Sequence, residues 1–372
     1  MRRRYGAWIR YGGPVTPDQV AFAAEHYASA ILQPWEVEVA TRLKAARPDM
    51  PVLAYKCLSS TRSYEPGPFF TSGLSWREAE NLGEHLFAHR ADGTRIEWAG
   101  YSGHWQMAVW MKEYRERWIA NVAAEFRDSV FDGVMADNDV FDDYYGLDLP
   151  FGDGCDLTGL RAALDELVTG AGRALNRIGK ILVPNIAESR REPGRWQRHA
   201  AFGGGYEEVW LAWGPDQHLD TPDVLAQTEC LHGPGLTVVR TASDGTDRHP
   251  NVLFGLAMFW IFGGGRPGTS YTATGHDQYN GVPHVPALCW DLGEPTGAPQ
   301  RKGGVRHRAF TGGWAAAHID RPGGRPVTLP VPAGLVTDTG AAAPATVRLA
   351  PRHGVLYRRA RGGPGCRSGA ER

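Results

Sequence analysis

The sequence has neither an excess of charge of one sign nor a long apolar run. Lys and Arg number 40 and Asp and Glu number 41, which gives a net charge of −1 at pH 7. Nothing therefore favours a nucleic-acid or membrane partner. The longest apolar run, residues 252–262, is too short to span a bilayer. Arginines follow Met1 but no apolar stretch follows them, so we expect a cytoplasmic protein, or a secreted one if an N-terminal signal was trimmed.

Several sequence motifs that indicate a bound cofactor or a catalytic nucleophile are also missing. The five cysteines are far apart, with no CxxC or Cys/His spacing, so the sequence predicts free thiols, no disulfide framework and no metal site. Ser59-Ser60 lacks the GxSxG setting of a serine hydrolase. The glycine-rich segment 263–268 lacks the GK[ST] ending and the GxGxxG spacing of phosphate loops. The sequence therefore predicts no metal and no cofactor.

Aromatic residues are abundant. The chain contains 13 Trp, 13 Tyr and 13 Phe. Most of them are expected in the core, but large aromatics also line pockets in which one ring face is apolar and one edge is polar. Sugar rings have apolar C–H faces and polar rims, so this composition is compatible with a carbohydrate ligand.

Residues 1–285 alternate between short apolar runs and helical patterns, which is typical of βα units. Thr16, Pro17 and Gln19 form a capping signal at the first helix. The expected strands are 5–10, 30–33, 51–55, 131–135, 180–184, 205–209 and 236–240, with a last one inside the apolar stretch 252–262. Eight strands predict an α/β fold, a closed (β/α)8 TIM barrel, with an open doubly wound sheet as the alternative.

The texture changes after residue 285. Helical periodicity disappears, and short strands are expected at 306–310, 314–319, 326–331 and 353–357, separated by glycine-rich turns. We interpret residues 286–361 as a small antiparallel β-sandwich domain and residues 362–372 as a disordered tail.

Barrel enzymes carry their catalytic groups at the C-terminal ends of the strands. Asp137, Asn138 and Asp139 follow the fourth expected strand, and a carboxylate there is costly unless it has partners or a task. The alternative is that Asp137 or Asp139 caps the following loop. The sixth strand carries Glu207 and Glu208, of which only one can face the barrel mouth.

Further polar and aromatic residues follow the other strands. The candidates for contacting a substrate are Tyr55, Lys56, Asn138, Asp139, Asn185, Glu207 and Asp244, with Trp98, Trp105 and Trp213 as stacking platforms. Cleavage of a glycosidic bond requires two carboxyl groups, one that protonates the leaving oxygen and one that acts as base or nucleophile. Asp137 and Glu208 end strands four and six, whose ends are close enough in a barrel to flank such a bond.

Short segments in order along the chain resemble a known family. These are residues 52–56 (VLAYK) with Ser59-Ser60, residues 91–96 (ADGTRI), residues 114–118 (YRERW) and residues 131–138 (FDGVMADN). Over residues 5–290 the chain resembles the glycoside hydrolase-like barrels called hypothetical glycosyl hydrolase family 15. It is similar more distantly to the endo-α-1,4-polygalactosaminidase barrels. The C-terminal part looks like the β-sandwich that often follows such barrels.

The resemblance implies a TIM barrel that acts on a glycosidic bond of an oligo- or polysaccharide. It implies that Asp137 is the nucleophile or base, that a carboxylate of strand six, best matched by Glu208, is the acid/base, and that Asn185 holds substrate hydroxyls. Two alternatives stay open at this point: a non-catalytic carbohydrate-binding barrel and a sugar-phosphate lyase or isomerase. The sugar, the linkage, the stereochemical course and the oligomeric state are not fixed by the sequence.

Overall fold

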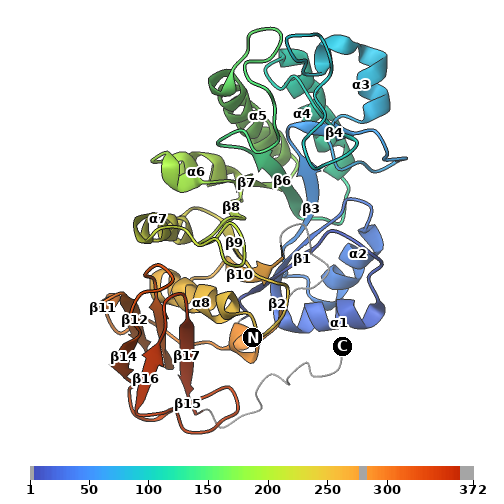
Figure 1. Ribbon diagram of the computed structural model, residues 1–372. Coiled ribbons are helices and arrows are strands. Elements are labelled where there is room, and N and C mark those ends of the chain that lie inside the picture. The colour runs from blue at the N-terminus through green and yellow to red at the C-terminus, as the bar shows by residue number, and fades with distance from the viewer. Residues whose placement is uncertain (1–3, 276–282, 361–372) are drawn as a thin grey trace. The chain divides into compact units, whose positions relative to one another are not determined.

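The structure is a computed structural model that describes residues 4–275 and 283–360. Eight parallel strands close into a barrel in the order β1-β10-β9-β8-β7-β6-β3-β2, which confirms the predicted barrel and rules out the open sheet (Figure 1). The strands are β1 (Gly6–Arg10), β2 (Tyr27–Leu32), β3 (Val52–Cys57), β6 (Gly133–Asp139), β7 (Ile181–Ile186), β8 (Gly204–Glu207), β9 (Leu236–Ala242) and β10 (Thr269–Thr274). The tail expected at 362–372 lies outside the described residues.

Helices alternate with these strands. They are α1 (Pro17–His26), α2 (Val37–Ala46), α3 (Trp76–Leu82), α4 (Lys112–Phe126), α5 (Leu157–Arg177), α6 (Arg195–His199), α7 (Thr221–Gln227) and α8 (Pro250–Met258). The start of α1 has the predicted capping box, in which Thr16 and Gln19 each bond to the backbone of the other. No helix in the described part of the chain is both long and apolar enough to cross a membrane.

The eighth barrel strand lies outside the apolar stretch in which it was expected. That stretch is wholly helical, because α8 continues directly into the π-helical turn Phe259–Gly263. Gly264, at φ 63°, ends the helix in the left-handed conformation. The chain then enters β10, whose sequence TSYTAT is rich in β-branched residues.

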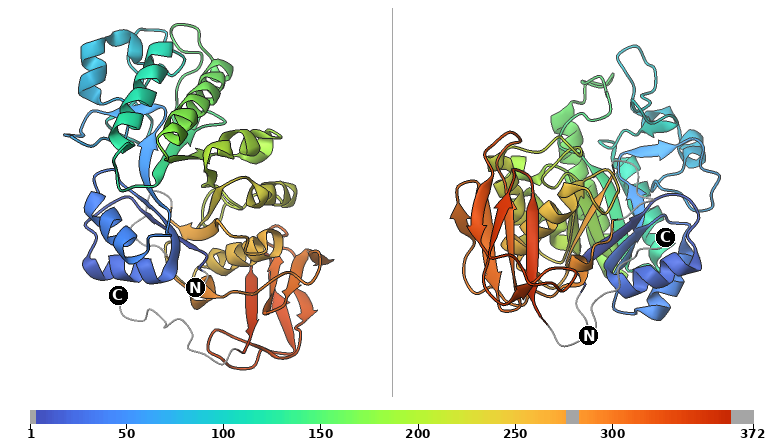
Figure 2. Two further views of the ribbon diagram at one scale, coloured as in Figure 1. Left: turned by 180° about the vertical axis from the view of Figure 1, so that it is seen from behind. Right: turned by 60° about the horizontal axis from the view of Figure 1, so that its bottom comes forward.

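The chain divides into two compact units. One comprises Ile31–Glu207 and Gly233–Leu236, and the other comprises Met1–Ala30, Glu208–His232 and Thr237–Arg372. In the first unit α4 and α5 pack against each other, as Figure 1 and the left view of Figure 2 show. Helix α4 is anchored to the end of β3, since Trp118 Nε1 donates to the Cys57 carbonyl at 2.8 Å and Tyr114 donates to the Leu58 carbonyl at 2.9 Å.

The long segment between β3 and α4 is ordered around its own small elements. It contains the antiparallel pair β4 (Ser60–Arg62) and β5 (His104–Gln106) together with α3. Its aromatic side chains pack on one another, for example Trp76 against Phe87 and Trp105. This packing keeps a loop of this length close to the C-terminal end of β3.

In the second unit, antiparallel sheets follow the barrel strands. The strands are β11 (Gln300–Lys302), β12 (Val305–Phe310), β13 (Gly313–His318), β14 (Val327–Pro330), β15 (Leu335–Val336), β16 (Thr346–Leu349) and β17 (Gly354–Arg359). They form one sheet in the order β11-β12-β13-β17-β15 and a second sheet, β14-β16, whose side chains share one core around Trp314 and Leu329. The strands that the sequence pattern missed, β11, β15 and β16, have four residues or fewer.

Helix α8 packs directly on β17 and β13 of the same unit. Gly354 makes the close approach possible, because a Cβ atom there would lie 2.5 Å from the Leu253 carbonyl oxygen. Any larger residue at position 354 would therefore force α8 and the sheet apart.

Candidate active site

Asp137 lies near the C-terminal end of β6 and is the centre of a hydrogen-bond network. Tyr55 donates its hydroxyl to Asp137 Oδ2 at 2.7 Å, and Asn185 Nδ2 donates to Oδ1 at 2.8 Å. The backbone N–H of Asn138 donates to the same Oδ1 at 2.9 Å. Three donors favour an ionised carboxylate, and they hold it in one orientation while the side chain stays partly exposed. The structure therefore brings together Tyr55, Asp137 and Asn185, which come from three adjacent barrel strands.

The phenol of Tyr55 is a donor at any ordinary pH. Burial raises its pKa well above 10.0, and the negative charge of Asp137 raises it further. The hydroxyl of Tyr55 therefore stays protonated and keeps donating to the carboxylate of Asp137. Asp137, and not Tyr55, remains the group that can act as a base.

Arg62, at the end of β4, extends this network and was not foreseen from the sequence. Its Nη2 donates to the Tyr55 hydroxyl at 3.3 Å, and its guanidinium lies 5.4 Å from the centre of the Tyr55 ring. Burial works against its charge, but Tyr55, Tyr64 and Glu65 outweigh it and raise the pKa of Arg62. The signal in the sequence was weak, since Arg62 is one of four arginines in the segment between β3 and α4 and no motif sets it apart.

A β-bulge next to Asp137 changes the direction of the residues that follow. The pairing of β6 with β7 shifts register between Ala136 and Asp139, and Asn138 has φ 69°. Asn138 is buried, donates to Cys57 Sγ at 3.1 Å and accepts from the Tyr145 hydroxyl. Asn138 therefore links β6 to β3 and to the loop that follows β6. The structure does not support the substrate contact expected for Asn138.

Asp139 also lies outside the hydrogen-bond network around Asp137. Without the bulge, alternation would direct it to the same side as Asp137. Instead it is fully buried and ion-paired with Arg195 at 2.8 Å and with His199 of α6. Although burial raises the pKa of Asp139, the charges of Arg195 and His199 outweigh this effect and lower it. The structure does not support the substrate contact expected for Asp139, because its carboxylate is ion-paired with Arg195 and His199.

His199 links Asp139 to Asp165 of α5, since its Nε2 lies 2.5 Å from Asp165 Oδ1. Burial alone would lower the pKa of His199, but the two carboxylates raise it from 6.5 to about 9. The imidazolium thus joins β6, α5 and α6 in one buried charge network.

This network predicts a pH dependence of stability. A raised histidine pKa stabilises the fold fully below pH 6.5, and the contribution is lost as the pH rises through 9. We expect the free energy of unfolding to fall between pH 6.5 and 9 by on the order of 3 kcal/mol. Urea denaturation at a series of pH values measures it. The variant His199→Gln should show a flatter profile over this range, and an equal slope in the variant and the wild type would refute the assignment.

Lys56 points away from Tyr55 and Asp137. Its side chain is fully buried and forms a 2.7 Å ion pair with Glu125 of α4, and its Nζ also donates to the Phe70 carbonyl. Burial lowers the pKa of Lys56, and Glu125 opposes that shift. The structure does not support the substrate contact expected for Lys56, since consecutive residues of a strand face opposite sides and Tyr55 occupies the inner one.

The aromatic side chains considered as sugar platforms divide into buried and accessible ones. Trp98 is only 4% exposed and stacks on Tyr145 with ring centres 3.8 Å apart, so it cannot serve as the expected sugar platform. Trp105 is partly exposed and Trp213 is 37% exposed, so both remain candidates. Tyr64, missed from the sequence, is 57% exposed and bonds to His104 at 2.8 Å.

Glu207 and Glu208, at the end of the sixth barrel strand, β8, lie in different surroundings. Glu207 is fully buried and accepts from Ser189 at 3.2 Å. Tyr206 pairs with Asn185 across β7 and β8, so alternation places Glu207 on the opposite side from Asn185. The substrate contact expected for Glu207 is therefore not supported. Glu208, directly after β8, is partly exposed, and its backbone carbonyl accepts from Arg240.

Asp244, expected to contact substrate after strand seven, is exposed and closes its own turn. Its Oδ1 accepts from both the backbone N–H and the hydroxyl of Thr246 at 2.8 Å. The backbone bond from Thr246 lowers the pKa of Asp244 most, and the hydroxyl bond adds to this shift, while burial opposes it. The geometry is that of an Asx turn, which accounts for the residue without a ligand. Among the described residues, one group of three side chains could hold a metal ion, His26 with His284 and Cys289.

Comparison with solved structures shows the fold. The maltogenic alpha-amylase AmyB from Thermotoga neapolitana has a TM-score of 0.53 at 8% identity, covering 95% of this chain and 98% of that one. Ega3 from Aspergillus fumigatus, solved with galactosamine, has a TM-score of 0.45 at 12% identity, covering 77% and 96%. The glycoside hydrolase domain of PelA from Pseudomonas aeruginosa also has a TM-score of 0.45, at 13% identity, covering 77% and 97%.

No curated protein matches the chain. The family description "Hypothetical glycosyl hydrolase family 15" matches residues 44–314, which run from the end of α2 through β10 to the start of β13. The match spans well over half of the sequence, and it contains Tyr55, Asp137, Asn185 and Glu208. The chain belongs to hypothetical glycosyl hydrolase family 15.

Proposed function

We propose that this protein hydrolyses a glycosidic bond of an oligo- or polysaccharide, with Asp137 as the nucleophile or base and Glu208 as the acid. Membership of a glycosyl hydrolase family supports the reaction class. The observation that carries the proposal is the setting of Asp137, a partly exposed carboxylate at a strand's C-terminal end that accepts hydrogen bonds from Tyr55, Asn185 and the Asn138 N–H.

This setting suits the charge changes of glycoside hydrolysis. The transition state resembles an oxocarbenium ion, so a fixed carboxylate beside the sugar stabilises its positive charge. The donors also prevent the side chain from rotating, because both of its oxygens are engaged. Arg62 keeps Tyr55 in place by donating from its Nη2 to the Tyr55 hydroxyl.

Backbone alternation supports Glu208 over Glu207 as the second carboxylate. Asn185 donates to Asp137 and pairs with Tyr206, so Tyr206 shares their side of the sheet. Gly205, two residues before Glu207, faces Trp196 of α6, because a Cβ atom there would lie 2.7 Å from that ring. Glu207 thus continues the helix-facing row, which leaves Glu208, directly after the strand, as the better candidate.

The test is a screen of the wild type, Glu208→Gln and Glu207→Gln against aryl glycosides and polysaccharides, with released sugar as the readout. We expect the wild type to cleave at least one substrate and Glu208→Gln to lose about 10²-fold or more of kcat/KM, the scale of a lost general acid. Activated aryl glycosides should lose less, since a good leaving group needs little protonation.

Glu207→Gln is the matched control, because it makes the same chemical change one residue away. It should keep turnover within a few-fold, since its amide can still accept from Ser189. If Glu207→Gln were the inactive variant and Glu208→Gln the active one, the assignment of the acid would be wrong. If the wild type bound a sugar and cleaved none, the chain would be a binding module.

A further inference from the structure

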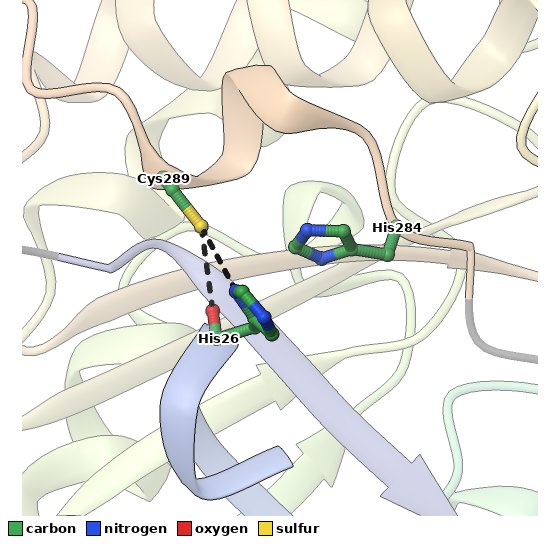
Figure 3. A group of neighbouring side chains, drawn as sticks. All are labelled: His26, His284 and Cys289. Carbon is green, nitrogen blue, oxygen red and sulfur yellow. Dashed lines mark hydrogen bonds between the residues drawn. The ribbon is translucent and has the colours of Figure 1, made fainter. Parts of the chain in front are cut away.

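Three potential metal ligands that lie far apart in the sequence meet in the unit that contains β1, β9 and β10. His26 is the last residue of α1, and His284 and Cys289 lie in the segment that follows β10. Figure 3 shows the three side chains converging, with the Cys289 sulfur directed at His26 and the His284 ring beside both. All three are buried, with at most 6% exposed.

The distances between the three side chains are close to those that a bound metal ion requires. One ligand atom from each residue lies within 4.8 Å of the other two, and Cys289 Sγ is 3.8 Å from His26 Nδ1. Tetrahedral zinc with bonds of about 2.3 Å to sulfur and about 2.0 Å to nitrogen requires a separation of about 3.6 Å between the sulfur and the nitrogen. The His26 and His284 rings have centres 4.9 Å apart, so small side-chain rotations would complete the geometry.

The surroundings also suit a metal site. Phe22 and Tyr27 place their rings against His284, with centres 5.1 and 5.8 Å away, and so form a largely apolar wall. If Nδ1 of His26 faces the metal, its Nε2 lies 3.8 Å from a carboxylate oxygen of Glu25. This distance is longer than a hydrogen bond, but a small movement of the exposed Glu25 side chain would let it accept from His26, as carboxylates usually do as outer partners in zinc sites.

We propose that His26, His284 and Cys289 bind one Zn²⁺ ion, with water in the fourth position. One thiolate and two imidazoles form a mixed sulfur and nitrogen ligand set that favours zinc over Mg²⁺ or Ca²⁺, which prefer oxygen ligands. On binding, the Cys289 thiol loses its proton to solvent and the zinc keeps its charge, so no oxidant or reductant is needed. The inference does not depend on the proposed hydrolytic function.

The position of the three residues indicates a structural role. His26 directly precedes β2, at the strand's N-terminal end, which in barrels serves stability rather than catalysis. The segment with Cys289 is tied to the first strand region by the bond from the Tyr5 N–H to the Leu288 carbonyl at 3.1 Å. Zinc would therefore join the α1–β2 turn to the chain that follows the last barrel strand.

The first experiment measures zinc affinity of the full chain after removal of metal with a chelator, in competition with a chromophoric zinc indicator. We expect one equivalent of Zn²⁺ per chain and a loss of affinity of at least about 100-fold in Cys289→Ser, a larger loss than for an outer partner. Glu25→Gln should lose about 10-fold. Cys230→Ser, which changes another buried thiol, should bind zinc as the wild type does.

A second measurement on the wild type alone covers the case in which Cys289→Ser does not fold. Co²⁺ added to the stripped protein should give the intense near-ultraviolet absorption of a thiolate–cobalt bond, and Zn²⁺ should displace it. Zinc should also protect Cys289 from alkylation, as read by mass spectrometry of its peptide, without protecting Cys230. Stoichiometric zinc with no thiolate absorption, or no zinc binding above background, would overturn the proposal and leave the cluster as ordinary packing around a thiol hydrogen bond.

Discussion

Asp137→Asn should reduce turnover by about 10³-fold or more while the protein folds normally, because the variant loses the charge that the reaction uses. The shape of the site should survive the change. The asparagine oxygen can take the place of Oδ1 and accept from Asn185 and the Asn138 N–H. Its amide then replaces Oδ2 and donates to the Tyr55 hydroxyl, which can act as an acceptor.

Kinetics on the substrate found in the screen, with thermal unfolding of the same preparations, measure this prediction. The melting temperature of Asp137→Asn should stay within a few degrees of the wild type, and the substrate should still bind. Tyr55→Phe is an informative companion, since it removes one donor and keeps the carboxylate, and we expect it to retain more activity than Asp137→Asn. Equal losses in the two variants would indicate that the network, and not the charge of Asp137, limits the rate.

Asp139→Asn should have the opposite effect, a large loss of stability. The change removes the buried carboxylate charge that Arg195 and the protonated His199 share, and leaves them only the partly exposed Glu192 and Asp165. Removal of one member of a buried ion pair costs about 3–5 kcal/mol. Urea denaturation near pH 6, where the histidine is charged, measures the loss of unfolding free energy.

Asp142→Asn provides the control for this prediction. Asp142 also pairs with an arginine, Arg191 at 3.1 Å, but both side chains are at least 40% exposed. Solvent screens such pairs, so the loss should be about 1 kcal/mol or less. A destabilisation of Asp139→Asn no larger than that of Asp142→Asn would show that the buried network does not stabilise the fold.

The barrel could be predicted from the sequence because most of its strands contain a short apolar run followed by a polar residue, although β10 (TSYTAT) does not. The same reasoning located Asp137 and Asn185, since the C-terminal ends of parallel strands gather at one end of a barrel. The direction of each side chain was harder to predict. Tyr55 and Lys56 were both assigned to the site, although neighbouring residues of a strand face opposite sides, and only Tyr55 contacts Asp137.

Asp139 shows a second reason for failure. Strict alternation would place Asp137 and Asp139 together, but the bulge at Asn138 redirects the chain between them. A bulge at a non-glycine residue leaves little trace in a single sequence. The prediction for Trp98 had a different weakness. Its stacking partner Tyr145 lies far along the chain, so the contact between the two rings could not be foreseen.

Groups assembled from distant segments were beyond the reach of sequence patterns. Arg62 contacts Tyr55, which in turn donates to Asp137, and a lone arginine at that position belongs to no recognisable motif. His26 and Cys289 are separated by 263 positions, so no Cys/His spacing rule could have found them. Both groups depend on how the chain folds back on itself, since β3 meets its long loop in one unit and the first helix meets the segment after β10 in the other.

The most direct test of the central claim is a comparison of wild type and Asp137→Asn for sugar release from one cleaved substrate, with binding of that substrate measured in parallel. The account predicts that Asp137→Asn binds the substrate with affinity close to that of the wild type and releases sugar about 10³-fold more slowly. Turnover of Asp137→Asn within about 10-fold of the wild type would contradict it, because a general base or nucleophile cannot be removed at so small a cost.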